Sequence, residues 1–109
     1  MAEKNNKISA AASRGLALLA ACGALAACVT APPVQEMSDA RQAISAAEQA
    51  NAGQLAPEPL GDARRFLAEA EQQLQDESYG PARLNAVRAK NRAAQALASS
   101  QSAADNNRR

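Results

Sequence analysis

The stretch LGDARRFLAEAEQQL, from Leu60 to Leu74, carries the clearest structural signal in the chain. Its apolar residues recur three or four positions apart, and this spacing places them on one face of an α-helix. These residues are Leu60, Ala63, Leu67, Ala70 and Leu74. Phe66 widens the face, and charged and amide side chains cover the rest of the helix. Since proline is tolerated in a first helical turn, Pro57 and Pro59 mark the start, and we predict a helix over residues 58–77.

A second helical pattern precedes this stretch. Its apolar positions again share one face, and they are Met37, Ala40, Ile44 and Ala47. Ser38 or Asp39 can cap the start, because their side-chain oxygens accept hydrogen bonds from the free backbone N–H groups of a first turn. Gly53 can adopt the left-handed conformation in which many helices end. We therefore predict a helix over residues 38–52.

A third pattern, rich in alanine, follows the break formed by residues 76–81. Its apolar positions are four and three residues apart, and they are Ala82, Ala86, Ala89, Ala93 and Ala96. Small side chains on this face let two helix axes approach closely. We predict a helix over residues 81–100, with Ser78 as a candidate cap. Residues 101–109 show no apolar period, and we expect them to form a disordered tail.

The last two helices should pair as an antiparallel hairpin, because the connection between them is short. Residues 60–77 carry two basic and five acidic side chains, whereas residues 81–100 carry four basic and no acidic ones, so the two helices bear net charges of −3 and +4. We expect Tyr79 at the bend and Phe66 or Leu67 against the alanine face. The predicted fold class is all-α: a signal peptide, a short tether and three helices. The hairpin resembles a tetratricopeptide unit, without the tryptophan and glycine of that repeat.

The first 27 residues have the organisation of a secretory signal peptide. Residues 1–14 are polar and carry three basic side chains, and residues 15–27 form an uncharged apolar run. The alternative is a membrane-spanning helix, which needs roughly 20 apolar residues. Pro32 and Pro33 end the apolar run before it reaches that length. We therefore predict a signal peptide over residues 1–27.

The end of this run resembles the lipobox of bacterial lipoproteins: Leu25, Ala26 and Ala27 precede Cys28. The resemblance implies that the Cys28 thiol receives a diacylglycerol and that the chain is cut just before this residue. Two or three acyl chains give stable membrane anchoring where a single chain is marginal. Residues 28–37 would then be the acylated cysteine and an extended tether.

The same four letters occur earlier, and this repeat makes Cys22 an alternative attachment site. We favour Cys28, because cutting before Cys22 would leave a hydrophobic run of only residues 15–21. Val29 follows Cys28 where an Asp tends to retain enterobacterial lipoproteins in the inner membrane. The resemblance therefore implies transport to the outer membrane.

The composition excludes several classes of chemistry. The chain has no His, so neither a Ser-His-Asp nor a Cys-His site can form, and metal sites lack their usual ligands. No glycine-rich phosphate loop is present. A net charge of +1, one Phe, one Tyr and no Trp offer no basis for nucleic-acid binding. We expect a non-enzymatic protein without a cofactor, a metal or a small-molecule substrate.

One basic cluster lies on the third predicted helix and consists of Arg83, Arg88, Lys90 and Arg92. It is a candidate interaction patch for anionic lipid headgroups, cell-wall carboxylates or an acidic protein. The simpler interpretation is that these side chains pair with the acidic second helix. Both interpretations stay open at the level of sequence.

Residues 40–98 resemble a family of bacterial envelope lipoproteins that contain a domain of unknown function, DUF4398. The residues that carry the resemblance lie in all three predicted helices and in the connections between them: Ala43, Ile44, Ala46, Ala47, Leu55, Ala56, Pro57, Leu60, Ala63, Arg64, Leu67, Ala70, Leu74, Tyr79, Ala82, Arg83, Ala86, Ala89 and Ala93. The resemblance implies an envelope lipoprotein. Together with the lipobox, it leads us to expect a protein held on the periplasmic face of the outer membrane, which presents its helical hairpin to an envelope protein or to a second copy. The alternative is a structural spacer that contacts the cell wall.

Overall fold

The computed structural model describes residues 31–109, and residues 32–109 form one compact unit. This part contains the helices α2 (Val34–Gln49), α3 (Ala52–Leu55), α4 (Pro57–Gln75) and α5 (Tyr79–Arg108), and it contains no strand. The predicted all-α class is confirmed. The predicted signal peptide and lipobox, including Cys22 and Cys28, lie outside the described residues.

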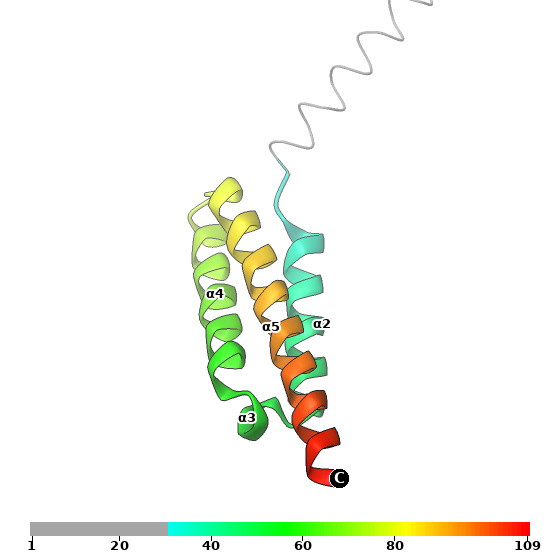
Figure 1. Ribbon diagram of the computed structural model, residues 1–109. Helices are drawn as coiled ribbons and strands as arrows, with labels where there is room; N and C mark the ends of the chain where they lie inside the picture. The colour runs from blue at the N-terminus through cyan, green and yellow to red at the C-terminus, as the bar shows by residue number, and fades with distance from the viewer. Residues whose placement is uncertain (1–30) are drawn as a thin grey trace, which may run out of the picture. The chain divides into compact units, whose positions relative to one another are not determined.

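The three long helices form a bundle (Figure 1). Helix α4 runs antiparallel to α5, as predicted, and the two pack along their length. Helix α2 runs parallel to α5 and packs more extensively against α5 than against α4. The short helix α3 lies at the end of the bundle where α2 connects to α4. Because each of the other three helices packs more extensively against α5 than against any other helix, α5 is the central element of the unit.

The core consists mainly of alanine methyl groups. The five alanines predicted to form the packing face of α5 all have 0% exposure: Ala82, Ala86, Ala89, Ala93 and Ala96. Ala93 and Ala96 pack in one cluster with Ile44 and Leu60, and Ala86 packs in a second cluster with Met37. Leu67 contacts both clusters of the core, one toward α3 and one toward the α4–α5 turn. The predicted apolar faces are therefore the buried faces.

Helix α2 begins four residues earlier than predicted, at Val34 rather than Ser38, and this shortens the expected tether of residues 28–37. Pro33 precedes the first turn and is fully buried, and its carbonyl accepts a hydrogen bond from the Met37 N–H at 3.0 Å. Proline suits this position because the first N–H groups of a helix have no acceptor within the helix, so the lack of an N–H in proline costs no helical hydrogen bond. Ser38 and Asp39 therefore do not cap the helix. They bond to side chains one turn away, Ser38 to Gln42 and Asp39 to Gln35.

Within residues 31–109, two residues other than glycine adopt left-handed backbone conformations after helix ends. Asn51 (φ 63°), not Gly53, follows the end of α2, and Gly53 lies within α3. Asparagine is among the residues that tolerate this conformation best. Glu77 (φ 59°) follows α4, and the Ser78 N–H donates to the Gln73 carbonyl at 2.8 Å. This bond closes the end of α4 in the manner of a Schellman motif.

Helix α5 continues to Arg108, so the prediction of a disordered tail over residues 101–109 was wrong. The predicted helix ended at Ser100 because the apolar period ends there. An absent period indicates only that the side chains are not packed, and no glycine or proline follows Pro81 to stop the helix. Ser100 is itself buried and donates its hydroxyl to the Ala96 carbonyl at 2.8 Å.

Candidate functional site

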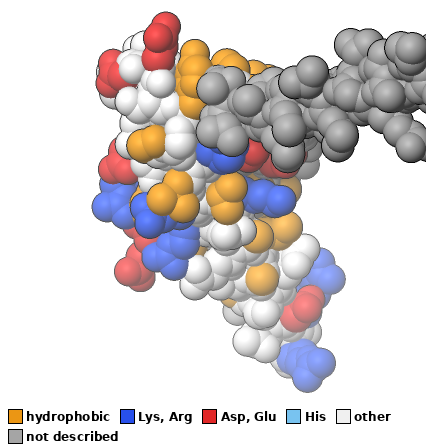
Figure 2. Space-filling model, turned by 90° about the horizontal axis from the view of Figure 1, so that it is seen from above, with side chains coloured by type: hydrophobic (Ala, Val, Ile, Leu, Met, Phe, Trp, Pro, Cys, Tyr) orange, Lys and Arg blue, Asp and Glu red, His pale blue; other side chains and the backbone are white. Residues whose placement is uncertain are grey.

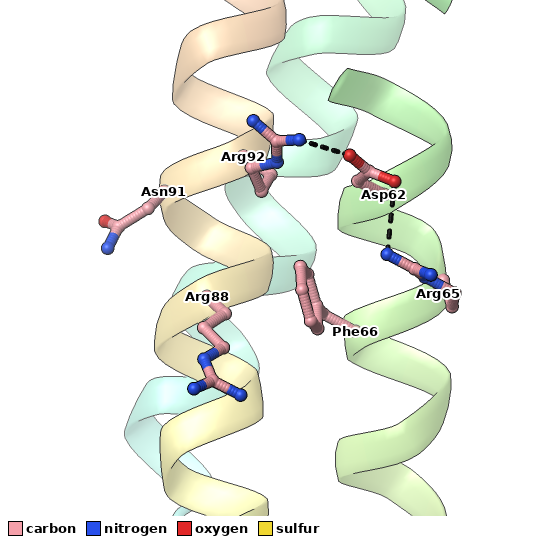
Figure 3. Close-up of a pocket in the computed structure, with 6 residues that line it drawn as sticks. All are labelled: Asp62, Arg65, Phe66, Arg88, Asn91 and Arg92. Carbon is pink, nitrogen blue, oxygen red and sulfur yellow. Dashed lines mark hydrogen bonds and ion pairs between the residues drawn. The ribbon is translucent and has the colours of Figure 1, made fainter. Parts of the chain in front are cut away.

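A shallow groove of about 350 Å³ lies between α4 and α5 (Figure 3). Its lining residues define what we call the arginine groove: Asp62, Arg65 and Phe66 from α4, and Arg88, Asn91 and Arg92 from α5. Three guanidinium groups and one carboxylate give it a local charge of +2. The groove is therefore the candidate binding site of the described unit.

The helical repeat brings these side chains together. Arg88 and Arg92 are one turn apart on α5, next to the buried Ala89 and Ala93. On α4, the buried Ala63 is preceded directly by Asp62 and followed within one helical turn by Arg65 and Phe66. The lining residues thus lie at the solvent-exposed margins of the two helix faces that pack together. Tight alanine packing beneath them holds the two edges close.

Asp62 is the acidic centre of the groove. Its carboxylate accepts hydrogen bonds from Arg65 of the same helix, at 3.2 Å, and from Arg92 of α5. One carboxylate thus compensates two arginines and joins the two helices. Arg88 has no such acidic partner, and it donates a long hydrogen bond of 3.4 Å to the side-chain oxygen of Asn85.

Phe66 lies between two guanidinium groups. The central carbon of Arg65 is 5.2 Å from the centroid of the ring, and that of Arg88 is 5.9 Å from it. Both distances lie within the range of cation–π attraction. Phe66 is half-buried, so its ring forms part of the groove surface (Figure 3). Figure 3 also shows Asn91 pointing outward at the rim.

The predicted basic patch is divided between two faces of α5. Arg88 and Arg92 line the groove beside α4, whereas the Nε–H of Arg83 donates to Glu36 of α2 at 3.1 Å. Lys90 is exposed and lies outside the groove. The predicted patch included two of the six lining residues, Arg88 and Arg92, and Phe66 was expected against α5 but not as part of a site. The others could have been found by projecting the predicted hairpin and asking which residues of α4 and α5 flank its packing faces.

The expected pairing of α4 with α5 through charge is realised at Asp62 and Arg92. Three other ion pairs join α2 to its neighbours instead. They are Arg41–Glu71 at 3.1 Å, Arg64–Glu48 at 2.8 Å and Arg83–Glu36 at 3.1 Å. The acidic side chains of α2 and α4 therefore face several different arginines, and Arg88 of α5 lies in the groove without a carboxylate partner.

Within residues 31–109, no group of three or more acidic or cysteine side chains is placed to hold a metal ion. In the same part of the chain, no helix is both long and apolar enough to cross a membrane. Every buried side-chain nitrogen or oxygen of the described unit has a hydrogen-bond partner. The arrangement there is suited to binding through exposed arginines and an aromatic ring.

In a comparison with protein families, the family described as "Domain of unknown function (DUF4398)" matches residues 35–109. The chain belongs to this family. The DUF4398 match begins in the first turn of α2 and includes α3, α4 and α5, so the helical bundle is the DUF4398 domain. No curated protein and no solved structure matches the chain.

Proposed function

We propose that this protein is a non-enzymatic lipoprotein of the bacterial outer membrane, anchored at Cys28 and presenting its DUF4398 bundle to another component of the envelope. The observation that carries the proposal is the sequence Leu25-Ala26-Ala27-Cys28 at the end of an uncharged apolar run. The residue types match the requirements of the modification, since a thiol is a strong nucleophile and small residues fit a peptidase cleft.

The early start of α2 supports a bundle held close to the membrane. Five residues separate Cys28 from Val34, where α2 begins. A chain spans at most about 3.5 Å per residue, so the first helix stays within roughly 20 Å of the acylated cysteine. A bundle on so short a connection can reach partners at the membrane surface, and this favours binding there over spanning a distance.

The absence of His from the chain and the content of the arginine groove support a binding role. The groove offers guanidinium donors and an aromatic face, which are common in protein interfaces. Its acid, Asp62, is paired with two arginines and joins α4 to α5. We therefore assign the bundle a role in recognition rather than in catalysis.

Intact-mass analysis of the protein purified from bacterial membranes tests the anchor. We expect wild-type protein to lack residues 1–27 and to carry the mass of the acyl chains. The Cys22→Ala variant should give the same product, whereas Cys28→Ala should stay unmodified and leave the outer-membrane fraction. Wild-type protein that still begins at Met1 and carries no fatty acid would overturn the proposal.

The cell-wall spacer, which is the alternative function, can be separated by the same preparation. A spacer of the cross-linked kind would remain attached to muropeptides after lysozyme digestion of the envelope. We expect the protein to be free of such fragments. Recovery of muropeptide-linked protein would favour the spacer and contradict a role confined to recognition.

A further inference from the structure

We propose that the arginine groove binds a carboxylate-bearing segment of a partner protein, with Arg65 and Arg88 as the principal donors. The inference rests on the proposed function for the presence of a partner in the envelope, and it names the chemistry of that partner. Four observations support it: the local charge, the geometry of the guanidinium groups, the exposed apolar side chains beside the groove, and the charge of the whole domain.

The groove has more positive charge than its own carboxylate compensates. Asp62 is shared between Arg65 and Arg92, and no acidic side chain is bonded to Arg88. Arg83, on the other side of α5, pairs with Glu36. The N–H groups of Arg88 that do not bond to Asn85 face the groove and the solvent, where an incoming carboxylate can accept them.

Contact with Phe66 prepares these arginines for a planar acceptor. Guanidinium groups that lie against an aromatic ring lose part of their rotational freedom before any ligand arrives. Their N–H groups point outward from the edge of the plane and can form two parallel bonds to one carboxylate. Arg65 and Arg88 approach the ring from different helices, so a ligand bound to both would be held by α4 and α5 together.

Exposed apolar side chains continue the surface along α5. Leu84 is 52% exposed and Val87 is 38% exposed, and each lies one helical turn before a residue of the groove, Arg88 and Asn91 respectively. Figure 2 shows hydrophobic side chains beside Lys and Arg side chains on one face of the unit. A protein segment with an acidic residue and a neighbouring apolar residue would contact both kinds of group.

The charge of the whole domain favours a protein over a lipid surface. Residues 31–109 carry nine basic and ten acidic side chains, a net charge of −1, so no long-range field draws the unit to anionic headgroups. Lipid recognition by charge uses clusters of about four to eight Lys or Arg. A free anion would be held weakly, because Arg65 and Arg92 are partly exposed and their attraction is screened by salt.

The binding experiment uses the full-length protein, purified in a neutral detergent, and a short fluorescent peptide rich in glutamate and leucine. A twin peptide with glutamine in place of each glutamate is the ligand control. Lys90→Ala is the protein control, because Lys90 is an exposed cation of the same helix that lies outside the groove. The measurements are the fluorescence anisotropy of each peptide and the melting temperature of each variant.

We expect the acidic peptide to bind at least tenfold more tightly than its glutamine twin. Arg88→Ala and Arg65→Ala should each weaken this binding about tenfold, the effect of losing a hydrogen bond to a charged group. Lys90→Ala should change it less than about twofold, since it removes a screened charge only. Equal binding of the two peptides, or equal effects of Arg88→Ala and Lys90→Ala, would overturn the proposal.

Competition separates the other sources of an anion. If inorganic phosphate or short-chain phosphatidylglycerol displaces the peptide at concentrations where a neutral salt of equal ionic strength does not, the groove is a phosphate site and the proposal fails. The result is independent of the lipid anchor, because Cys28→Ala should bind the acidic peptide as wild type does. A failed anchor with intact peptide binding, or the reverse, therefore shows which proposal is wrong.

Discussion

At the scale of single residues, Phe66 and Leu67 show how neighbouring apolar side chains take different roles. Either was expected to pack on the alanine face of α5. Leu67 does so, and it contacts both clusters of the core. Phe66, about 100° further around the helix, lies at the edge of that face, where its ring meets two arginines. The periodicity predicted an apolar stripe, but only the rotation of α4 decides which residue lies at its centre.

Asp62 provides a test in which stability and binding move in opposite directions. Asp62→Asn removes a carboxylate that two arginines share, so we expect the free energy of unfolding to fall by about 0.5–1 kcal/mol, a small value because these side chains are partly exposed. The same change leaves the groove with three uncompensated cations. The acidic peptide should therefore bind about three- to tenfold more tightly than to wild type.

The matched control for this prediction is Glu69→Gln, which removes the same charge from the same helix outside the groove. Chemical denaturation and peptide anisotropy measure the two quantities. Weaker peptide binding by Asp62→Asn, or an equal gain for Glu69→Gln, would contradict a role for Asp62 as an internal competitor of the ligand.

At the scale of helices, the interiors were predictable and the ends were not. Interiors follow from the spacing of apolar residues, which is a property of the side chains. The ends depend on the backbone: Pro33 precedes α2, and Asn51 and Glu77 take left-handed conformations after α2 and α4. Glutamate has no special preference for that conformation, so Glu77 was not recognisable as a joint. Helix α5 similarly continues to Arg108 because no glycine or proline interrupts it after Pro81, and the apolar spacing did not indicate this.

The alanine face of α5 sets the distance between the helices, and adjacent residues test this. Ala93 is fully buried and Ala94 is exposed. Ala93→Leu inserts three carbon atoms between closely packed helices, and we expect it to lower the free energy of unfolding by about 1–3 kcal/mol. Ala94→Leu should change it by less than about 0.5 kcal/mol, because both residues favour helices and the site faces solvent. Urea denaturation followed by circular dichroism measures both values, and similar losses would contradict close packing at Ala93.

At the scale of the whole molecule, the sequence predicted the hairpin but not the position of α2. Opposite net charges indicated that the last two helices attract each other, yet three of the ion pairs connect α2 to α4 or α5. A long-range pair depends on the rotation and offset of two helices, which one sequence does not reveal. The same limit explains why the basic cluster was found but its division between two faces was not.

A charge exchange between α2 and α4 tests this arrangement. Arg64 of α4 donates two hydrogen bonds to Glu48 of α2, the shorter at 2.8 Å. Arg64→Glu and Glu48→Arg each place like charges together, and each should lower the free energy of unfolding by about 0.5–1 kcal/mol, a modest cost since both side chains are half-exposed. The double variant restores opposite charges and should return to within about 0.3 kcal/mol of wild type.

The control combines Arg64→Glu with Asp105→Arg, which alters a charge near the far end of α5. Separate sites add, so this double variant should show the sum of its two single effects. The exchange at Glu48 and Arg64 should instead show a coupling energy, because each change alters the partner of the other. Since these residues are 16 positions apart in the chain and on different helices, coupling requires α2 to approach α4 closely enough for this ion pair, whereas simple additivity at this pair would place α2 elsewhere.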